Sequence, residues 1–188
     1  MQAFLVSLGT VALAEIGDRT QLLALVLAAR FRRPWPILAG ILCASAANHA
    51  VAGLIGVWIG HRLAPRTLDI IVGLGMIAMA IWTLKPDKLE ESPVPASAAG
   101  AFIATLTSFF LAEIGDRTQI ATVALAAAYP SLVAVVSGTT LGMLLANAPV
   151  VALGKTFAHR LPILALRIGA SAVFLALGIL NMTRIAWR

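Results

Sequence analysis

The stretch Ala14-Glu15-Ile16-Gly17-Asp18-Arg19-Thr20-Gln21 decides the fold of this chain, because the same eight residues return at positions 112–119. Both copies lie inside long apolar runs, where a carboxylate costs about 2.5–3.5 kcal/mol on membrane-insertion scales. Each copy nevertheless carries two carboxylates and one guanidinium. Six charges in two matched sets indicate a function, since ionisable residues within a membrane mark ion and substrate pathways.

The composition predicts an all-α membrane protein. Of the 188 residues, 60% are apolar and only 12% are charged, which is unlike a soluble domain. About 20 apolar residues cross a bilayer as a helix, so the length suffices for six spans, whereas barrel strands would be shorter and would alternate in polarity. The expected spans are about Phe4–Ala29, Ile37–Gly60, Thr67–Leu84, a span within Ala96–Ala128, Leu132–Gly154 and Ile163–Ala186.

Other features of the composition exclude several classes of function. The formal net charge is +6, but the basic residues are scattered at segment ends, so nucleic-acid binding is not expected. The single cysteine, Cys43, allows no intrachain disulfide and no thiolate metal site, and is predicted to be a small buried apolar residue. Neither an enzymatic activity nor a permanently bound cofactor is expected.

The two halves of the chain repeat beyond the motif. Phe4 matches Phe102 at an offset of 98 residues, and Asn48 matches Asn147 if one residue is inserted. Within a single transmembrane domain covering 1–188, the repeats are therefore 1–84 and 96–188, joined by a charged linker, 85–95. Because three spans are an odd number, the second repeat must enter the membrane from the opposite side. Inverted repeats of this kind are typical of secondary transporters, whose sites lie near the midplane at the repeat interface.

The charges of the loops predict the orientation. One side carries seven basic residues, namely Arg30, Arg32, Arg33, Lys85, Lys88, Lys155 and Arg160. The other side carries four, namely Arg62, Arg66, Arg184 and Arg188. The positive-inside rule then places both termini outside and the linker in the cytoplasm.

The spacing of the motif predicts a cluster of acids. In a continuous helix, residues three and four apart share a face, so Glu15 and Asp18 should point the same way, as should Glu113 and Asp116. Gly17 and its counterpart should permit close helix approach or local unwinding. Four carboxylates and two arginines sum to −2, which one divalent cation or two protons would neutralise. Burial and like-charge crowding favour proton binding near neutral pH, as a cation/proton exchanger requires.

The nature of the donors narrows the choice of ion. Carboxylates and neutral oxygen donors suit Ca²⁺, Mn²⁺ or Mg²⁺, and His49 is the only histidine well inside a span. Candidate neutral donors are Thr20, Gln21, Asn48, Thr118, Gln119 and Asn147. Each of the two asparagines could instead form interhelical hydrogen bonds. Arg19 and Arg117 could balance the charge of the empty pocket, gate it, or bind carbonyl groups; His49 could be a packing residue or a proton relay.

The doubled Glu-Ile-Gly-Asp-Arg-Thr element, the six spans and the charged linker resemble the GDT-type family of Ca²⁺/Mn²⁺:H⁺ exchangers, a branch of the lysine-exporter superfamily. The resemblance implies export of Mn²⁺ or Ca²⁺ from the cytoplasm in exchange for protons. It also implies that Glu15, Asp18, Glu113 and Asp116 bind the cation. The chain is compact and without an obvious targeting peptide, so a multi-pass protein of a prokaryotic plasma membrane is expected.

Two other functions remain open at this point. The chain could export a cationic organic solute such as lysine, although one ammonium group needs fewer acids. It could also be a non-transporting membrane assembly factor whose charged helices are docking surfaces. Apart from these functions, the motif acids could be structural, with each glutamate held by the arginine of its own motif. The expected partners are a divalent cation, protons and the lipid bilayer, and the sequence leaves open whether copies of the chain form a homo-oligomer.

Overall fold

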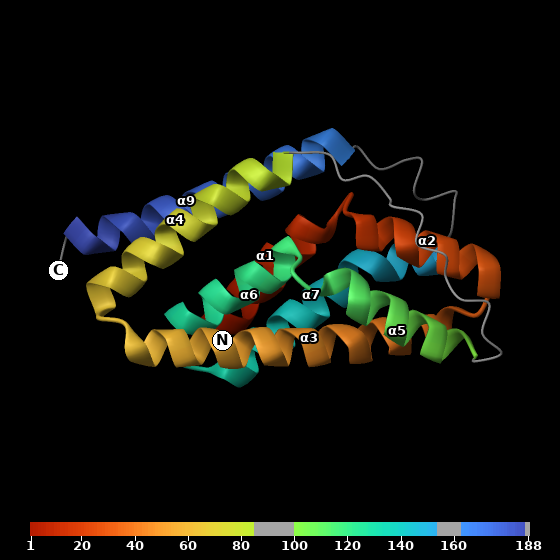
Figure 1. Cartoon of the computed structure of the whole chain (residues 1–188). Helices are drawn as coiled ribbons and strands as arrows, with labels where there is room; N and C mark the ends of the chain where they lie inside the picture. Colours follow the sequence, from red (N-terminus) through yellow and green to blue (C-terminus); the bar gives the residue numbers. More distant parts are fainter. Residues whose placement is uncertain (85–99, 154–162, 187–188) are drawn as a thin grey trace.

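A computed structural model describes residues 1–84, 100–153 and 163–186. The secondary structure of these residues is entirely helical, which confirms the predicted all-α class. The helices are α1 (Gln2–Glu15), α2 (Arg19–Phe31), α3 (Pro34–Arg62), α4 (Pro65–Leu84), α5 (Ala101–Glu113), α6 (Arg117–Ala128), α7 (Leu132–Leu153) and α9 (Ile163–Ala186) (Figure 1). The predicted linker, 85–95, lies outside the described residues.

The first and fourth expected spans are not continuous helices, so the prediction of an unbroken helical face through each motif was wrong. The chain leaves α1 after Glu15 and enters α2 at Arg19, and the second motif is broken in the same way between α5 and α6. Gly17 has φ +79° and Gly115 has φ +73°. Because a side chain is disfavoured in this left-handed region, glycine is the residue that such a turn requires.

Within the part of the chain that the structure describes, two helices are long and apolar enough to cross a membrane, judged by length and composition. They are α3, with 29 residues, and the stretch Leu132–Ala152 within α7, with 21 residues. The four helices that flank the motifs have only 12 to 14 residues each. None of these four is long enough to span a bilayer alone, since a helix rises 1.5 Å per residue.

Corresponding helices of the two halves make corresponding contacts. Helix α1 packs against α7, and its counterpart α5 packs against α3. A Cβ atom added at Gly138 would lie 2.5 Å from the carbonyl oxygen of Phe4, and one at Gly40 would lie 2.9 Å from that of Phe102. The glycines therefore allow close approach at matching points, because only a missing side chain leaves room for the facing backbone. Phe4 and Phe102, whose carbonyls the two glycines face, are also the residues that the sequence repeat matches.

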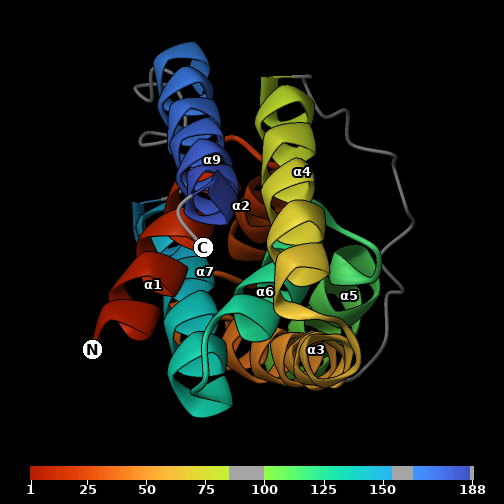
Figure 2. The same ribbon diagram turned by 90° about the vertical axis from the view of Figure 1, so that its left-hand side faces the viewer.

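Helices α4 and α9 form a pair that lies side by side in both views (Figures 1 and 2). Gly73 and Gly178 face each other across this pair, and the Ser171 hydroxyl donates to the carbonyl of Ala80 at 2.8 Å. The pair also contacts one helix of each motif region: α4 packs against α6, and α9 packs against α1. Its packing against α2 and α5 is much slighter among the described residues.

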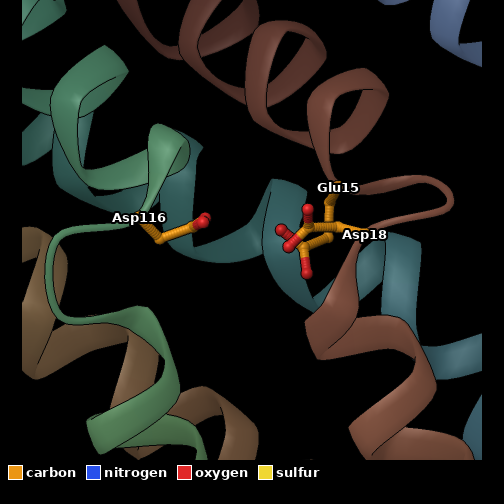
Figure 3. A group of neighbouring side chains, drawn as sticks. All are labelled: Glu15, Asp18 and Asp116. Carbon is orange, nitrogen blue, oxygen red and sulfur yellow. The ribbon is translucent and has the colours of Figure 1, made fainter. Parts of the chain in front are cut away.

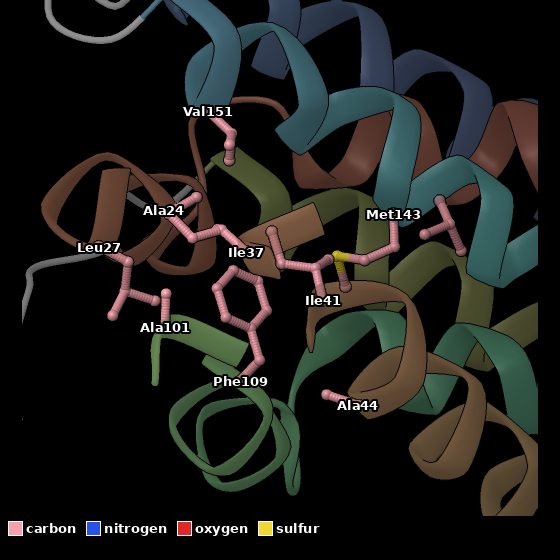
Figure 4. Packing of buried hydrophobic residues seen from close by; sticks show 10 residues of the cluster. Ala24, Leu27, Ile37, Ile41, Ala44, Ala101, Phe109, Met143 and Val151 are labelled. Carbon is pink, nitrogen blue, oxygen red and sulfur yellow. The ribbon is translucent and has the colours of Figure 1, made fainter. Parts of the chain in front are cut away.

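Apolar clusters fill the space around the motifs. One cluster joins α2, α3, α5 and α7 through Leu27, Ile41, Phe109 and Met143 (Figure 4). Many large apolar side chains are instead exposed, among them Leu54, Ile81 and Leu111, as on a surface that contacts lipid. Cys43 is also exposed on α3, so the prediction that it is buried was wrong. Its neighbours on the exposed face are apolar, and a thiol behaves there as one more small apolar group.

Candidate metal centre

The acids of the two motifs meet at the centre of the molecule. One carboxylate oxygen from each of Glu15, Asp18 and Asp116 lies within 4.8 Å of the other two. These three residues, called the acid triad below, are 0%, 1% and 4% exposed. Their carboxylates point toward one another from separate elements (Figure 3). Glu113, the fourth predicted acid, is equally buried but lies outside this group.

The helix breaks create this arrangement. Glu15 is the last residue of α1, Asp18 precedes the first residue of α2, and Asp116 precedes the first residue of α6. Aspartate is favoured at such positions because helix N-termini leave amides unpaired; the carboxylate of Asp116 accepts from the amide of Thr118 at 3.3 Å. The carbonyl ends of α1 and α5 also face the centre, and these helix ends carry partial negative charge that favours a cation.

The arginines pair across the repeat boundary. Arg117 donates to Asp18 in a buried ion pair, and Arg19 donates to Asp116 at 3.4 Å. Arg19 also donates to the carbonyl of Ala112 at 2.8 Å, the residue that begins the second motif. Within the described residues, then, each arginine reaches the aspartate of the other motif and not the glutamate of its own. This geometry disagrees with the alternative in which each glutamate is held by its own arginine.

The two arginines differ in exposure, although their pairing is symmetrical. The side chain of Arg117 is 3% exposed and that of Arg19 is 41% exposed. Arg117 begins α6, which the α4–α9 pair covers, whereas Arg19 begins α2, which that pair leaves largely uncovered. Among the described residues, the two otherwise matching ion pairs therefore differ in how much of the arginine is exposed.

The glutamates have different partners. Glu113 accepts from the hydroxyl of Ser45 at 2.7 Å and from the amide of Asn48 at 3.2 Å, so both of its carboxylate oxygens are occupied. Ser45 was not among the predicted site residues. A sequence signal was present, because a serine three residues before an intramembrane asparagine shares its helix face. Among the described residues, Glu15 accepts a hydrogen bond from the amide of Asn147 alone, at 3.4 Å, and its second oxygen is buried without a partner.

The remaining predicted donors support the helix breaks. Gln21 accepts from the amide of Gly17 and Gln119 accepts from that of Gly115, each at 2.9 Å. The Gln21 amide also donates to the carbonyl of Ala146 at 3.0 Å. The hydroxyls of Thr20 and Thr118 donate to Asp18 and Asp116 at 3.3 and 3.1 Å respectively. These contacts hold the two turns and orient the two aspartates.

His49 is buried, as expected for a packing residue. Its Nδ1 lies 3.4 Å from the hydroxyl of Thr140, and its Nε2 has no partner. It belongs to α3, next to Asn48, but contacts α7 and not the acid triad. No contact in the described residues joins it to the acids.

The donors and charges of the centre fit a hard divalent cation. The oxygens come from carboxylates and amides, and the charge of four ionised acids with two arginines is −2. Such a charge is costly in a buried site unless a cation or protons balance it. The donors and the charge of the site therefore suit a divalent cation.

Comparison with known proteins gives a consistent picture. The family model described as "Divalent cation/proton antiporter GDT1" matches residues 3–91 and 101–186. A Vibrio cholerae protein named "Putative manganese exporter" is 48% identical over 182 residues, covering 95% of this chain and 90% of that protein. A GDT1-like protein of Synechocystis is 31% identical over 147 residues, covering 68% of this chain and 71% of that protein. No solved structure matches the chain at a significant level.

Proposed function

Because the chain belongs to the divalent cation/proton antiporter GDT1 family, we propose that it exchanges a divalent cation for protons and exports the metal from the cytoplasm. The observation that carries this proposal is the acid triad, in which one acid of the second motif meets two of the first within 4.8 Å. The cross-paired arginines leave the four motif acids with a charge of −2. Either one divalent cation or two protons neutralise that charge, so the cation and the protons would replace each other in the site.

The transported ion is Mn²⁺ or Ca²⁺ in this proposal. Carboxylate and amide oxygens bind both ions, and the Vibrio cholerae relative carries the name of a manganese exporter. Glu15, Asp18, Glu113 and Asp116 are the proposed exchanging acids: the acid triad would contact the cation, and Glu113 would contribute negative charge and a proton site. Arg19 and Arg117 are the proposed counter-charges of the pocket. The metal ion is the transported substrate and not a cofactor.

The proposed architecture is six spans in two inverted repeats, 1–84 and 96–188. Its support is the matched contact set: α1 with α7 and α5 with α3, each through a glycine facing a phenylalanine carbonyl. In this scheme α1–α2 and α5–α6 each form one broken span. Broken helices at the midplane are typical of transporters, because the interrupted backbone can serve the substrate.

Alternating access follows from the same scheme. Arg117 is 3% exposed and begins α6, against which α4 packs, while Arg19 is 41% exposed; in our proposal this difference marks a site that opens toward α2 and α5. With both termini outside, as the loop charges predict, that side faces the cytoplasm. The chain would then be an inward-open transporter in a prokaryotic plasma membrane, with the linker, 85–95, in the cytoplasm.

Purified protein in proteoliposomes tests the function. We expect Mn²⁺ or Ca²⁺ uptake driven by an outward proton gradient, together with proton release that protein-free liposomes lack. Flux of lysine without flux of metal would replace the exchanger with an organic-cation exporter. The absence of all flux, in protein that is folded by circular dichroism and gel filtration, would favour an assembly factor.

A further inference from the structure

The two asparagines that the sequence repeat pairs are used differently in the structure. Asn48 donates to the carbonyl of Phe110 at 3.1 Å and to Glu113 at 3.2 Å. Asn147 donates to the carbonyl of Met143 at 3.0 Å and lies 3.4 Å from Glu15. Both side chains are buried, at 3% and 0% exposure. The two side chains differ in the amide oxygen, which has no hydrogen-bond partner in Asn147.

Asn147 leaves an acceptor without a donor. Its Oδ1 has no hydrogen-bond partner, and neither has Oε2 of Glu15, the carboxylate beside it. Buried polar atoms are nearly always satisfied, and an exception needs an explanation. The two residues are neighbours, since the Asn147 amide nitrogen lies 3.4 Å from Glu15. A cation bound beside Glu15 would give both oxygens a partner, which the donors of the described residues do not.

A single inserted residue accounts for this asymmetry. Gly40 and Gly138 face equivalent carbonyls at an offset of 98 residues, whereas Asn48 and Asn147 are 99 apart. One extra residue turns a position by about 100° around a helix. The second asparagine therefore keeps a longer contact with the glutamate of the other motif, at 3.4 Å, but donates to a carbonyl of its own helix and not to one of the facing helix. At the offset of 98, the counterpart of Ser45 is Met143, which has no hydroxyl to donate to Glu15.

We propose that the amide oxygen of Asn147 is a ligand of the transported cation, together with the acid triad. In this assignment the cation site is one-sided: Glu15 and Asn147 bind the cation, whereas their counterparts Glu113 and Asn48 do not. Ser45 and Asn48 donate to both carboxylate oxygens of Glu113, which keeps Glu113 out of the ligand set. The amide nitrogen of Asn147 donates to the Met143 carbonyl, and its amide oxygen binds the cation. The proposal rests on the proposed function, since it names the ligands of the same site.

The chemistry suits Mn²⁺ and Ca²⁺ equally. Both ions accept neutral amide oxygens beside carboxylates. A neutral fourth donor adds coordination without adding charge, so the −2 balance that the exchange requires is kept. A fourth carboxylate at this point would instead bind the cation more tightly and leave the site overcharged when it is empty.

The experiment measures equilibrium binding of Mn²⁺ to purified protein by electron paramagnetic resonance titration of free Mn²⁺. Asn147→Leu, which removes the oxygen in a similar volume, should weaken Mn²⁺ binding about tenfold or more, the range seen when groups around a metal are lost. The matched variant Asn48→Leu should weaken binding much less, because Asn48 contacts Glu113 and not one of the proposed ligands. Asn147→Asp, which keeps an oxygen but loses the amide donor, should bind Mn²⁺ at least as tightly as the unaltered protein.

The outcomes separate this proposal from the proposed function. Equal losses in Asn147→Leu and Asn48→Leu would mean that the site is symmetrical, and would overturn the one-sided assignment. Weaker binding by Asn147→Asp would mean that the residue acts only as a donor, which also overturns it and holds even if Asn147→Leu fails to fold. If the unaltered protein binds no divalent cation at all, the proposed function fails as well.

Discussion

Arg117 forms a buried ion pair with Asp18, so the arginine of the second motif neutralises an acid of the first. The reciprocal pair joins Arg19 to Asp116 at 3.4 Å. Because of this exchange, neither motif balances its own charges. The two halves of the chain must meet before either aspartate has its counter-charge, which ties assembly of the fold to assembly of the site.

The two ion pairs should differ in their effect on stability. Arg117→Met leaves Asp18 as a buried, uncompensated charge, and losing one partner of a buried pair costs about 3–5 kcal/mol. The partly exposed Arg19 should cost less when replaced, because exposed pairs contribute only about 0–1 kcal/mol. Thermal unfolding in detergent should therefore show a larger fall in Tm for Arg117→Met than for Arg19→Met. Equal falls would contradict the difference in burial.

The turns between the half-helices depend on glycine. Gly17→Ala and Gly115→Ala each force a side chain into the left-handed region, at a cost of about 1–2 kcal/mol. Both variants should lower Tm and weaken Mn²⁺ binding, since the turn places the aspartate. Gly9→Ala is the matched control: it lies within α1 with open space around an added Cβ, so its Tm should be unchanged or raised. A destabilised control would remove the significance of the comparison.

The sequence predicted the acids but not the geometry that unites them. Composition and apolar runs predicted α9 with its observed bounds and α3 to within three residues at each end. Periodicity failed at the motifs because it assumes one continuous helix, whereas Gly17 and Gly115 turn the chain there. Asp18 followed three residues later by Gln21 is a helix-start signature, and it was the available signal for the break.

Long-range contacts were beyond reach of the sequence for a different reason. The hydroxyl that contacts Glu113 belongs to α3, and the carbonyls that Asn48 and Asn147 contact belong to α5 and α7. A repeat offset does not give the rotation of these groups about their helix axes. One inserted residue between Gly138 and Asn147 was visible, but its effect on the direction of the amide depends on packing. Ser45 was missed for the same reason.

Both motif glutamates should be essential to exchange. Glu15→Gln and Glu113→Gln each remove one negative charge, so a divalent cation and two protons no longer neutralise the pocket. Each variant should abolish metal-coupled proton movement in proteoliposomes while it still inserts and folds. Asp69, on α4 and away from the motifs, supplies the control Asp69→Asn, which should exchange normally. Normal exchange by either glutamate variant would remove that residue from the site.

Exchange should be insensitive to membrane voltage. One divalent cation moving against two protons carries no net charge, whereas each uncompensated charge would respond by about 2.3 kcal/mol per 100 mV. We expect Mn²⁺ flux to stay the same when valinomycin and potassium gradients set the potential of the liposomes. A marked dependence would mean that the −2 balance omits a charged group.

The α4–α9 pair rests on α6 and α1 but hardly on α2 and α5. Interchanging the repeats converts these contacts into a second set, α4 with α5 and α9 with α2. If the proposed alternating access is right, this second set of contacts would form in the opposite state, in which Arg19 is covered and Arg117 is uncovered. Cysteine cross-links between α4 and α6, in a Cys43→Ser background, should lock one arrangement, and links between α4 and α5 the other. Two matched repeats that exchange their contacts in this way would present one ion site to each side of the membrane in turn.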